Sequence, residues 1–157
     1  WTALMWASSY DNLKVVQKLI KAGADINIQD NSGMTALMHA CFKNSFDVVQ
    51  ILIEAGADIN IEDNEGRTAL IWASSYDNLE VVQELIKAGA DLNVQDNDGE
   101  TALMWASSFN NLKVVQELIK AGADVNIQDD KGKTALSYAK KNKNQEIIDI
   151  LIKAGAK

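Results

Sequence analysis

The only histidine and the only cysteine of the chain, His39 and Cys41, are the nearest approach to a nucleophile–base pair. Two residues that are two positions apart on a helix point about 200° away from each other, so these side chains cannot form an activating hydrogen bond. Cys41 is therefore expected to be a small packed residue. His39 has no cluster of other ligands around it, which argues against a metal site. With no paired carboxylates or Ser–His–Asp arrangement either, we predict no catalytic residue and no enzyme activity.

Two short motifs have the composition of ligand sites but the wrong spacing. Gly132-Lys133-Thr134 ends like a phosphate-binding loop, but the first glycine of such a loop would fall at Ile127. Asp96-Asn97-Asp98-Gly99 resembles part of a calcium loop. Aligning its glycine places Val94 and Trp105 at the two terminal ligand positions, where oxygen ligands are required. We predict no cofactor and no metal.

The composition limits the partners and the compartment. The chain has 157 residues and a formal net charge of −7, which argues against binding nucleic acid, because phosphates require a basic surface. Residues 1–100 hold 6 basic and 16 acidic side chains, whereas residues 101–157 hold 9 and 6. No apolar run approaches the roughly 20 residues that span a membrane. A single cysteine forms no internal disulfide, so we predict an intracellular, cytoplasmic protein, with delivery into another cell left open.

A strict 33-residue period organises the chain. Thr-Ala-Leu begins at Thr2, Thr35, Thr68, Thr101 and Thr134, and Ala-Gly-Ala follows in step, with its glycine at Gly23, Gly56, Gly89, Gly122 and Gly155. We predict a single domain, 1–157, with repeats at 2–34, 35–67, 68–100 and 101–133 and a capping repeat at 134–157.

Each repeat contains the signals of two helices and a turn. Thr35 is suited to cap a helix that runs from Ala36 to about Asn44, and the apolar spacing predicts a second helix from Phe46 to Glu54. Gly56 lies where a left-handed C-cap residue is needed. Asp63-Asn64-Glu65-Gly66 has the composition of a tight turn.

The period and the TALMWA, GADIN and DNSG motifs resemble the ankyrin repeat over essentially the whole chain. The resemblance implies an all-α solenoid of stacked antiparallel helix pairs with projecting β-hairpin or turn fingers. It also implies that inner helices and fingers line a concave surface that binds other proteins. Two departures indicate a natural TALMWA-type subfamily: the chain has no proline, and the family's histidine position holds Met5, Met38, Ile71, Met104 and Ser137.

The two end repeats differ in kind. The fifth has the polar run 140–145, which is typical of a terminal repeat that faces water. The first repeat shows no such change, so we expect the native polypeptide to have at least one more repeat upstream, and the chain to be a fragment.

A helical wheel groups the aromatic side chains on one face of the first helix of each repeat. They form two columns. The first column is Trp6, His39, Trp72, Trp105 and Tyr138, and the second column is Tyr10, Lys43, Tyr76, Phe109 and Asn142. Packed helices lie about 8–10 Å apart, so rings of successive repeats are too far apart to stack but can flank one inserted side chain. Two interpretations stay open: the tryptophans fill the groove floor, or they form a partly exposed surface that binds a partner.

The second repeat and the fingers carry the variation that specificity requires. His39, Phe42 and Lys43 replace the Trp, Ser and Tyr of other repeats, and positions 32–34, 65–67, 98–100 and 131–133 differ between fingers. The candidate partner-binding residues are Trp6, Tyr10, Met34, His39, Phe42, Lys43, Arg67, Trp72, Tyr76, Glu100, Trp105 and Phe109.

These observations predict a monomeric, non-enzymatic module that binds another protein or peptide with apolar and basic features. Two other classes remain open. The chain could be the regulatory or targeting arm of a larger enzyme whose catalytic part is absent, or it could be a self-assembling structural array.

Overall fold

The computed structural model describes all 157 residues and contains ten helices and no strand. Their bounds are α1 Ala3–Ser9, α2 Leu13–Lys21, α3 Ala36–Phe42, α4 Phe46–Glu54, α5 Ala69–Ser75, α6 Leu79–Lys87, α7 Ala102–Ser108, α8 Leu112–Lys120, α9 Ala135–Lys141 and α10 Gln145–Lys153. None of them is both long enough and apolar enough to cross a membrane.

The helix boundaries follow from local signals in the sequence. The Thr35 hydroxyl accepts a hydrogen bond from the Met38 N–H at 3.3 Å, as expected for an N-cap. The expectation that the first helix reaches about Asn44 is wrong, because α3 ends at Phe42 and Asn44 adopts a left-handed conformation with φ 57°. The second helix, Phe46–Glu54, has the expected bounds, and Gly56 follows it with φ 89°.

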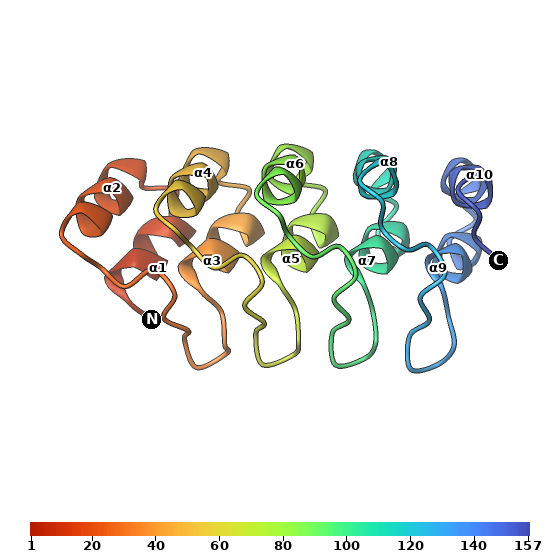
Figure 1. The fold of residues 1–157 in the computed structure, drawn as a ribbon, viewed down its shortest axis with the longest axis horizontal. Helices are drawn as coiled ribbons and strands as arrows, with labels where there is room; N and C mark the ends of the chain where they lie inside the picture. The colour runs from red at the N-terminus through yellow and green to blue at the C-terminus, as the bar shows by residue number, and fades with distance from the viewer.

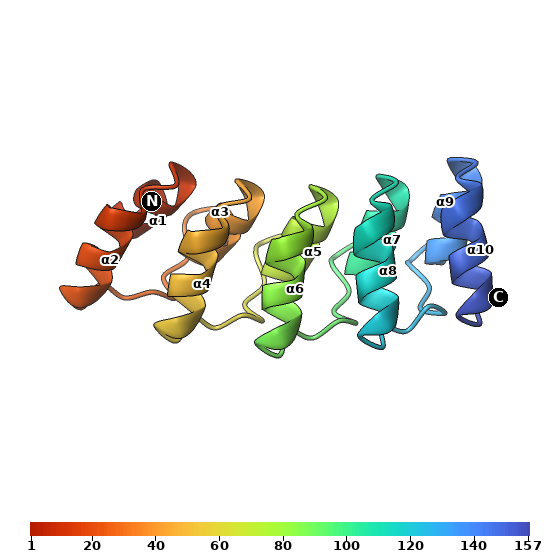
Figure 2. The same ribbon diagram turned by 90° about the horizontal axis from the view of Figure 1, so that it is seen from above.

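The ten helices form two rows (Figure 1). Inner helices α1, α3, α5, α7 and α9 lie side by side in one row, and each outer helix packs on the inner helix of its own repeat. Seen from above, the helix pairs succeed one another along the long axis, with the termini at opposite ends (Figure 2). The segments 24–34, 57–67, 90–100 and 123–133 connect each outer helix to the next inner helix, and their tips project beyond the inner row (Figure 1). We call these segments the fingers.

A continuous apolar core lies between the two rows. Leu70 and Ile71 of α5 and Val82 and Leu85 of α6 are at most 1% exposed, and they belong to one cluster that runs through all five repeats. Fully burying a side chain of this size contributes about 1.5–3 kcal/mol. The apolar residues that replace the family's histidine lie in this core: Met5, Met38, Ile71 and Met104.

The fingers are tight turns that bond to one another. The Gly66 N–H donates to Asp63 O at 2.9 Å, which closes the expected turn. The Asn64 N–H donates to Ser32 O of the preceding finger at 3.0 Å, and the Asn97 N–H donates to Glu65 O at 2.9 Å. The inner helices and the fingers therefore form one continuous surface, on which the two columns lie.

Candidate functional site

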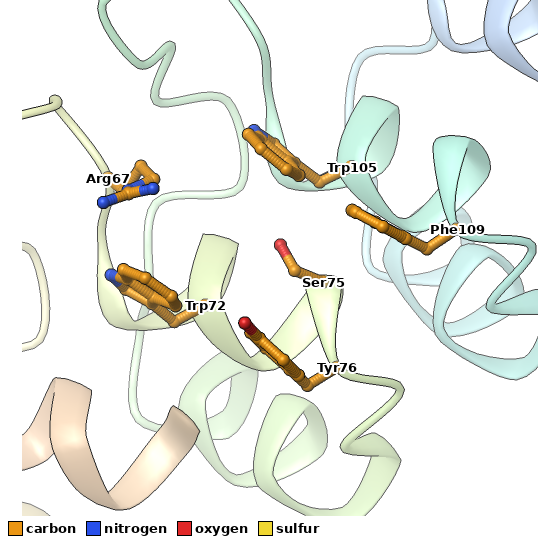
Figure 3. Close-up of a pocket in the computed structure, with 6 residues that line it drawn as sticks. All are labelled: Arg67, Trp72, Ser75, Tyr76, Trp105 and Phe109. Carbon is orange, nitrogen blue, oxygen red and sulfur yellow. The ribbon is translucent and has the colours of Figure 1, made fainter. Parts of the chain in front are cut away.

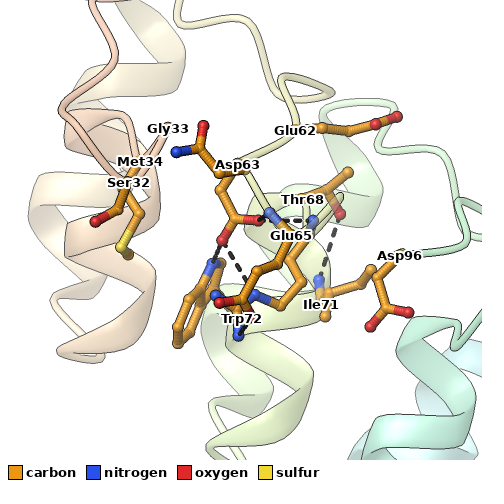
Figure 4. Close-up of polar contacts among 12 residues, drawn as sticks. Ser32, Gly33, Met34, Glu62, Asp63, Glu65, Thr68, Ile71, Trp72 and Asp96 are labelled. Atoms are coloured by element: carbon orange, nitrogen blue, oxygen red, sulfur yellow. Dashed lines mark hydrogen bonds and ion pairs between the residues drawn. The ribbon is translucent and has the colours of Figure 1, made fainter. Parts of the chain in front are cut away.

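An aspartate in each of the four fingers holds the first-column residue that follows it by nine positions. The Trp72 indole Nε1–H donates to Asp63 Oδ2 at 3.0 Å (Figure 4), and Trp105 Nε1–H donates to Asp96 Oδ2 at 2.8 Å. The contacts of His39 Nε2 with Asp30 Oδ2, at 2.9 Å, and of the Tyr138 hydroxyl with Asp129 Oδ2, at 2.6 Å, are equivalent. Four of the five first-column residues, all except Trp6, are thereby fixed by hydrogen bonds as well as by packing.

The other oxygen of the same carboxylate shapes the finger. Asp63 Oδ1 accepts the backbone N–H groups of Glu65 and Arg67, each at 2.9 Å. The same pair of bonds, to the residues two and four positions later, recurs at Asp30, Asp96 and Asp129. One buried side chain therefore connects the conformation of a finger to the position of a ring on the inner helix.

This environment changes the acidity of two of these carboxyls. Burial raises the pKa of Asp30, but the hydrogen bonds with His39 and with the Met34 and Ser32 N–H groups outweigh it and hold the pKa below its usual value. At Asp129 burial likewise opposes ionisation, and bonds from Tyr138 and two backbone N–H groups lower the pKa overall. Burial, followed by the contacts with Asp129 and Glu100, raises the pKa of the Tyr138 phenol.

Three repeats present a pair of stacked rings on the groove face. The ring centroids lie 5.8 Å apart in Trp6–Tyr10, 6.2 Å in Trp72–Tyr76 and 5.8 Å in Trp105–Phe109, and their planes differ by only 11–13°. Residues four apart lie on one helix face, which brings the rings together. Tyr76 and Phe109 are 51% and 55% exposed, whereas Trp72 and Trp105 are half-buried. Trp72 and Trp105 therefore fill part of the groove floor and are also partly exposed: the indole N–H is bound to a finger, and part of the ring faces solvent. Binding of a partner to these rings stays a prediction.

An open pocket of about 310 Å³ lies between α5 and α7 (Figure 3). Its lining residues are Arg67, Trp72, Ser75, Tyr76, Trp105 and Phe109. The Arg67 guanidinium lies over the Trp72 ring, 4.2 Å from its centroid, and forms ion pairs with Asp63 and Glu65 at 3.0 and 2.8 Å. Two aromatic pairs and one cation thus surround this pocket.

The second repeat has a different surface, as its sequence indicates. Phe42 packs edge-on against Trp72 and Tyr76, and the Lys43 Nζ lies 4.9 Å from the centre of the Phe42 ring. Beside them is a pocket of about 280 Å³, lined by Trp1, Ser9, Met34, His39, Phe42, Lys43 and Trp72.

The other candidate residues differ in accessibility and in position. His39 is only 5% exposed, beneath the ring of Trp1 at 4.2 Å. Glu100 accepts a hydrogen bond from the Tyr138 hydroxyl. Trp6 of α1 and Tyr10, the C-cap residue of that helix, are exposed, but they lie away from the pocket between α5 and α7.

The residues considered for catalysis or ligand binding are buried or packed against other side chains. Cys41 is fully buried, and burial strongly raises the pKa of its thiol. Lys133 of the Gly-Lys-Thr motif lies over the Tyr138 ring, with its Nζ 5.8 Å from the centroid. Nowhere do three or more His, Cys, Asp or Glu side chains gather in a way that could hold a metal ion.

Sequence reasoning missed the finger aspartates, although the sequence carries a signal for them. In repeats two to five the first-column residue changes from His to Trp, Trp and Tyr, yet each of these types has a ring N–H or a hydroxyl that can donate. An aspartate stands nine residues before each of them, at Asp30, Asp63, Asp96 and Asp129. A side-chain donor that always stands nine residues after an aspartate is a sequence pattern that could have predicted this hydrogen bond.

The fold and the groove define a solenoid of helix pairs with projecting fingers. A family model described as ankyrin repeats (3 copies) matches residues 4–96 and 75–157. The chain belongs to the ankyrin repeat family. A search of curated proteins finds no match.

Proposed function

We propose that this chain is a protein-interaction module that binds a partner protein or peptide across its inner helices and fingers. Ankyrin repeats are generally protein–protein interaction modules and typically non-catalytic. The proposal for this chain is supported chiefly by one observation, the stacked rings of the two columns. Trp72 and Trp105 are held in place by buried carboxylates, while the rings of Tyr76 and Phe109 remain exposed to solvent.

A fixed aromatic surface of this kind has the properties of a binding hot spot. Tyr and Trp bury a large area with few rotatable bonds, and they are enriched among the residues that contribute most to binding. In Trp72 and Trp105 the hydrogen bond to a finger removes further freedom before a partner arrives, which lowers the entropy cost of association. The acidic side chains of residues 1–100 favour a partner that also carries basic groups.

The test is a double substitution, Trp72→Ala with Trp105→Ala, in an affinity capture from the source cell. We expect the captured partner to be lost, while the helical circular dichroism signal survives because the buried core between the rows is unchanged. Val15→Ala is the control, since Val15 is an exposed apolar residue of the outer helix α2. If partner binding persists in the double variant, or if binding and helicity vanish together, the proposal is wrong.

A further inference from the structure

The gaps between successive inner helices are filled in different ways. The Trp1 ring lies between Trp6 and His39, with centroids 4.5 and 4.2 Å away, at the step from α1 to α3. Phe42 occupies the step from α3 to α5, beside the pocket of about 280 Å³. At the step from α7 to α9, the Asn142 side-chain amide donates to Ser108 O at 2.6 Å. The remaining step, from α5 to α7, contains the open pocket of about 310 Å³.

Phe42 shows how a ring is received at such a step. Its ring meets Trp72 at a centroid distance of 5.7 Å and an angle of 86°, and Tyr76 at 4.9 Å and 77°. This edge-to-face geometry places the positive ring edge against the negative face of the neighbour and is favourable beyond the burial of area. The stacked pair formed by Trp72 of α5 and its C-cap residue Tyr76 therefore binds, in an edge-to-face arrangement, a ring that comes from the previous repeat.

The next repeat has the same receiving pair but not the inserted ring. Trp105 and Phe109 stand 33 residues after Trp72 and Tyr76, and they stack with nearly the same geometry, 5.8 Å and 13°. The residue 33 positions after Phe42 is Ser75, which is too small to reach them. Figure 3 shows Ser75 between the two aromatic pairs.

The polar groups around this pocket restrict what can enter it. The Ser75 hydroxyl already donates to Ile71 O at 2.8 Å. The Arg67 guanidinium already lies over the Trp72 ring, 4.2 Å from its centroid, and Asp63 and Glu65 pair with its charge. The cation position on that ring is therefore already taken. Four aromatic walls and one cation fit a flat, uncharged, apolar group.

We propose that the pocket between α5 and α7 receives one aromatic side chain of the partner, seated edge-on against Trp105 and Phe109 as Phe42 is seated against Trp72 and Tyr76. This assignment rests on the proposed function and adds the chemistry of the partner residue: Phe, Tyr or Trp. In the step from α3 to α5 the chain supplies the ring itself, as Phe42. In the step from α5 to α7 the partner would supply it.

The direct test uses N-acetylphenylalanine amide as the probe and the indole N–H signals of the four tryptophans as the readout in NMR titrations. The Trp105 and Trp72 signals should shift and saturate, while that of Trp6, which lines neither pocket, serves as the internal reference. Ser75→Phe should fill the pocket with a side chain of the protein itself and lower the affinity for the probe by about tenfold or more. Ser9→Phe is the matched control, because Ser9 lines the other apolar pocket. N-acetyllysine amide and tetramethylammonium should bind more weakly than the aromatic amide.

A second variant, with the opposite change, keeps the proposal testable if Ser75→Phe does not fold. Phe42→Ser removes the resident ring and should create a second site for the same probe, detected as a larger shift of Trp72. The proposal is overturned if the wild-type signals do not saturate, if Ser75→Phe binds the probe as well as wild type does, or if tetramethylammonium binds more tightly. A captured partner that is lost in the Trp72→Ala, Trp105→Ala variant but retained by Ser75→Phe would leave the proposed function standing and refute only the pocket assignment.

Discussion

At the scale of single residues, the finger aspartates connect the backbone to the binding face. One oxygen of Asp96 accepts the N–H groups of Asp98 and Glu100, and the other accepts only the Trp105 indole N–H. At Asp63 the corresponding oxygen accepts from both Trp72 and the Arg67 Nε. Two chemically similar sites thus differ in one respect: only Asp63 keeps a partner when its tryptophan is removed.

Replacing each tryptophan by phenylalanine tests this difference. Trp105→Phe leaves a buried carboxylate oxygen without a donor and should lower the free energy of unfolding by about 1–3 kcal/mol. Trp72→Phe loses one hydrogen bond while Arg67 still satisfies Asp63, so the expected loss is about 0.5–1.5 kcal/mol. Urea unfolding followed by circular dichroism measures both values. Equal losses, or a larger loss for Trp72→Phe, would contradict the role given to Arg67.

At the scale of elements, the fingers and the helix ends use glycine for two different reasons. Gly56 ends α4 with φ 89°, and a Cβ placed on it would meet nothing within 4 Å. Gly66 ends the turn of a finger with φ 76°, and its Cβ would lie 2.8 Å from Asn97 Oδ1 and 2.9 Å from Asn97 N. The first glycine is needed for its backbone conformation alone, and the second also for the close approach of the next finger.

Alanine substitutions should therefore rank in a definite order. Gly56→Ala should cost about 1–2 kcal/mol, which is the cost of a left-handed backbone in a residue with a Cβ. Gly66→Ala should cost more, about 2–5 kcal/mol, because the fingers must also move apart. Thermal or urea unfolding of the two variants gives the comparison. A Gly66→Ala variant as stable as Gly56→Ala would show that the next finger moves away from the added Cβ at little cost in free energy.

The elements also show what sequence can predict. The helix Phe46–Glu54, the threonine cap and the turn glycines follow from signals within a few residues, and all were predicted correctly. The grouping of Trp72 and Tyr76 on one helix face follows from the 3.6-residue period. The hydrogen bond from Trp72 to Asp63 and the packing of Phe42 against Trp72 and Tyr76 were not predicted. Both join different elements, and their geometry depends on the spacing between repeats, which no local pattern contains.

At the scale of the whole molecule, the two carboxyls with a lowered pKa belong to the first and the last finger, so acid should weaken the chain near both ends. The pKa of Asp30 and that of Asp129 are lower in the folded state than their usual values. A carboxyl with a depressed folded pKa contributes stability that is complete above its unfolded pKa of about 3.9. That contribution is lost as the pH falls through the folded pKa.

The stability of the protein should therefore decrease steeply below about pH 4 and change little with these carboxyls between about pH 5 and 7. Urea midpoints measured across this range give the profile. Asp129→Asn should be less stable at neutral pH and should show a shallower acid limb, since one of the depressed groups no longer titrates. An acid limb identical to that of wild type would mean that Asp129 does not contribute.

The differing gaps between inner helices have a consequence for how an elongated ligand aligns. A solenoid with identical repeats offers such a ligand several equivalent registers, each displaced by one repeat, and the bound state would be degenerate. Here the successive steps hold the Trp1 ring, the Phe42 ring, an open pocket and the Asn142 amide. A ligand shifted by one repeat meets a different obstacle at every step. Small side-chain changes on a periodic scaffold therefore favour one register and one direction for an elongated ligand along the groove.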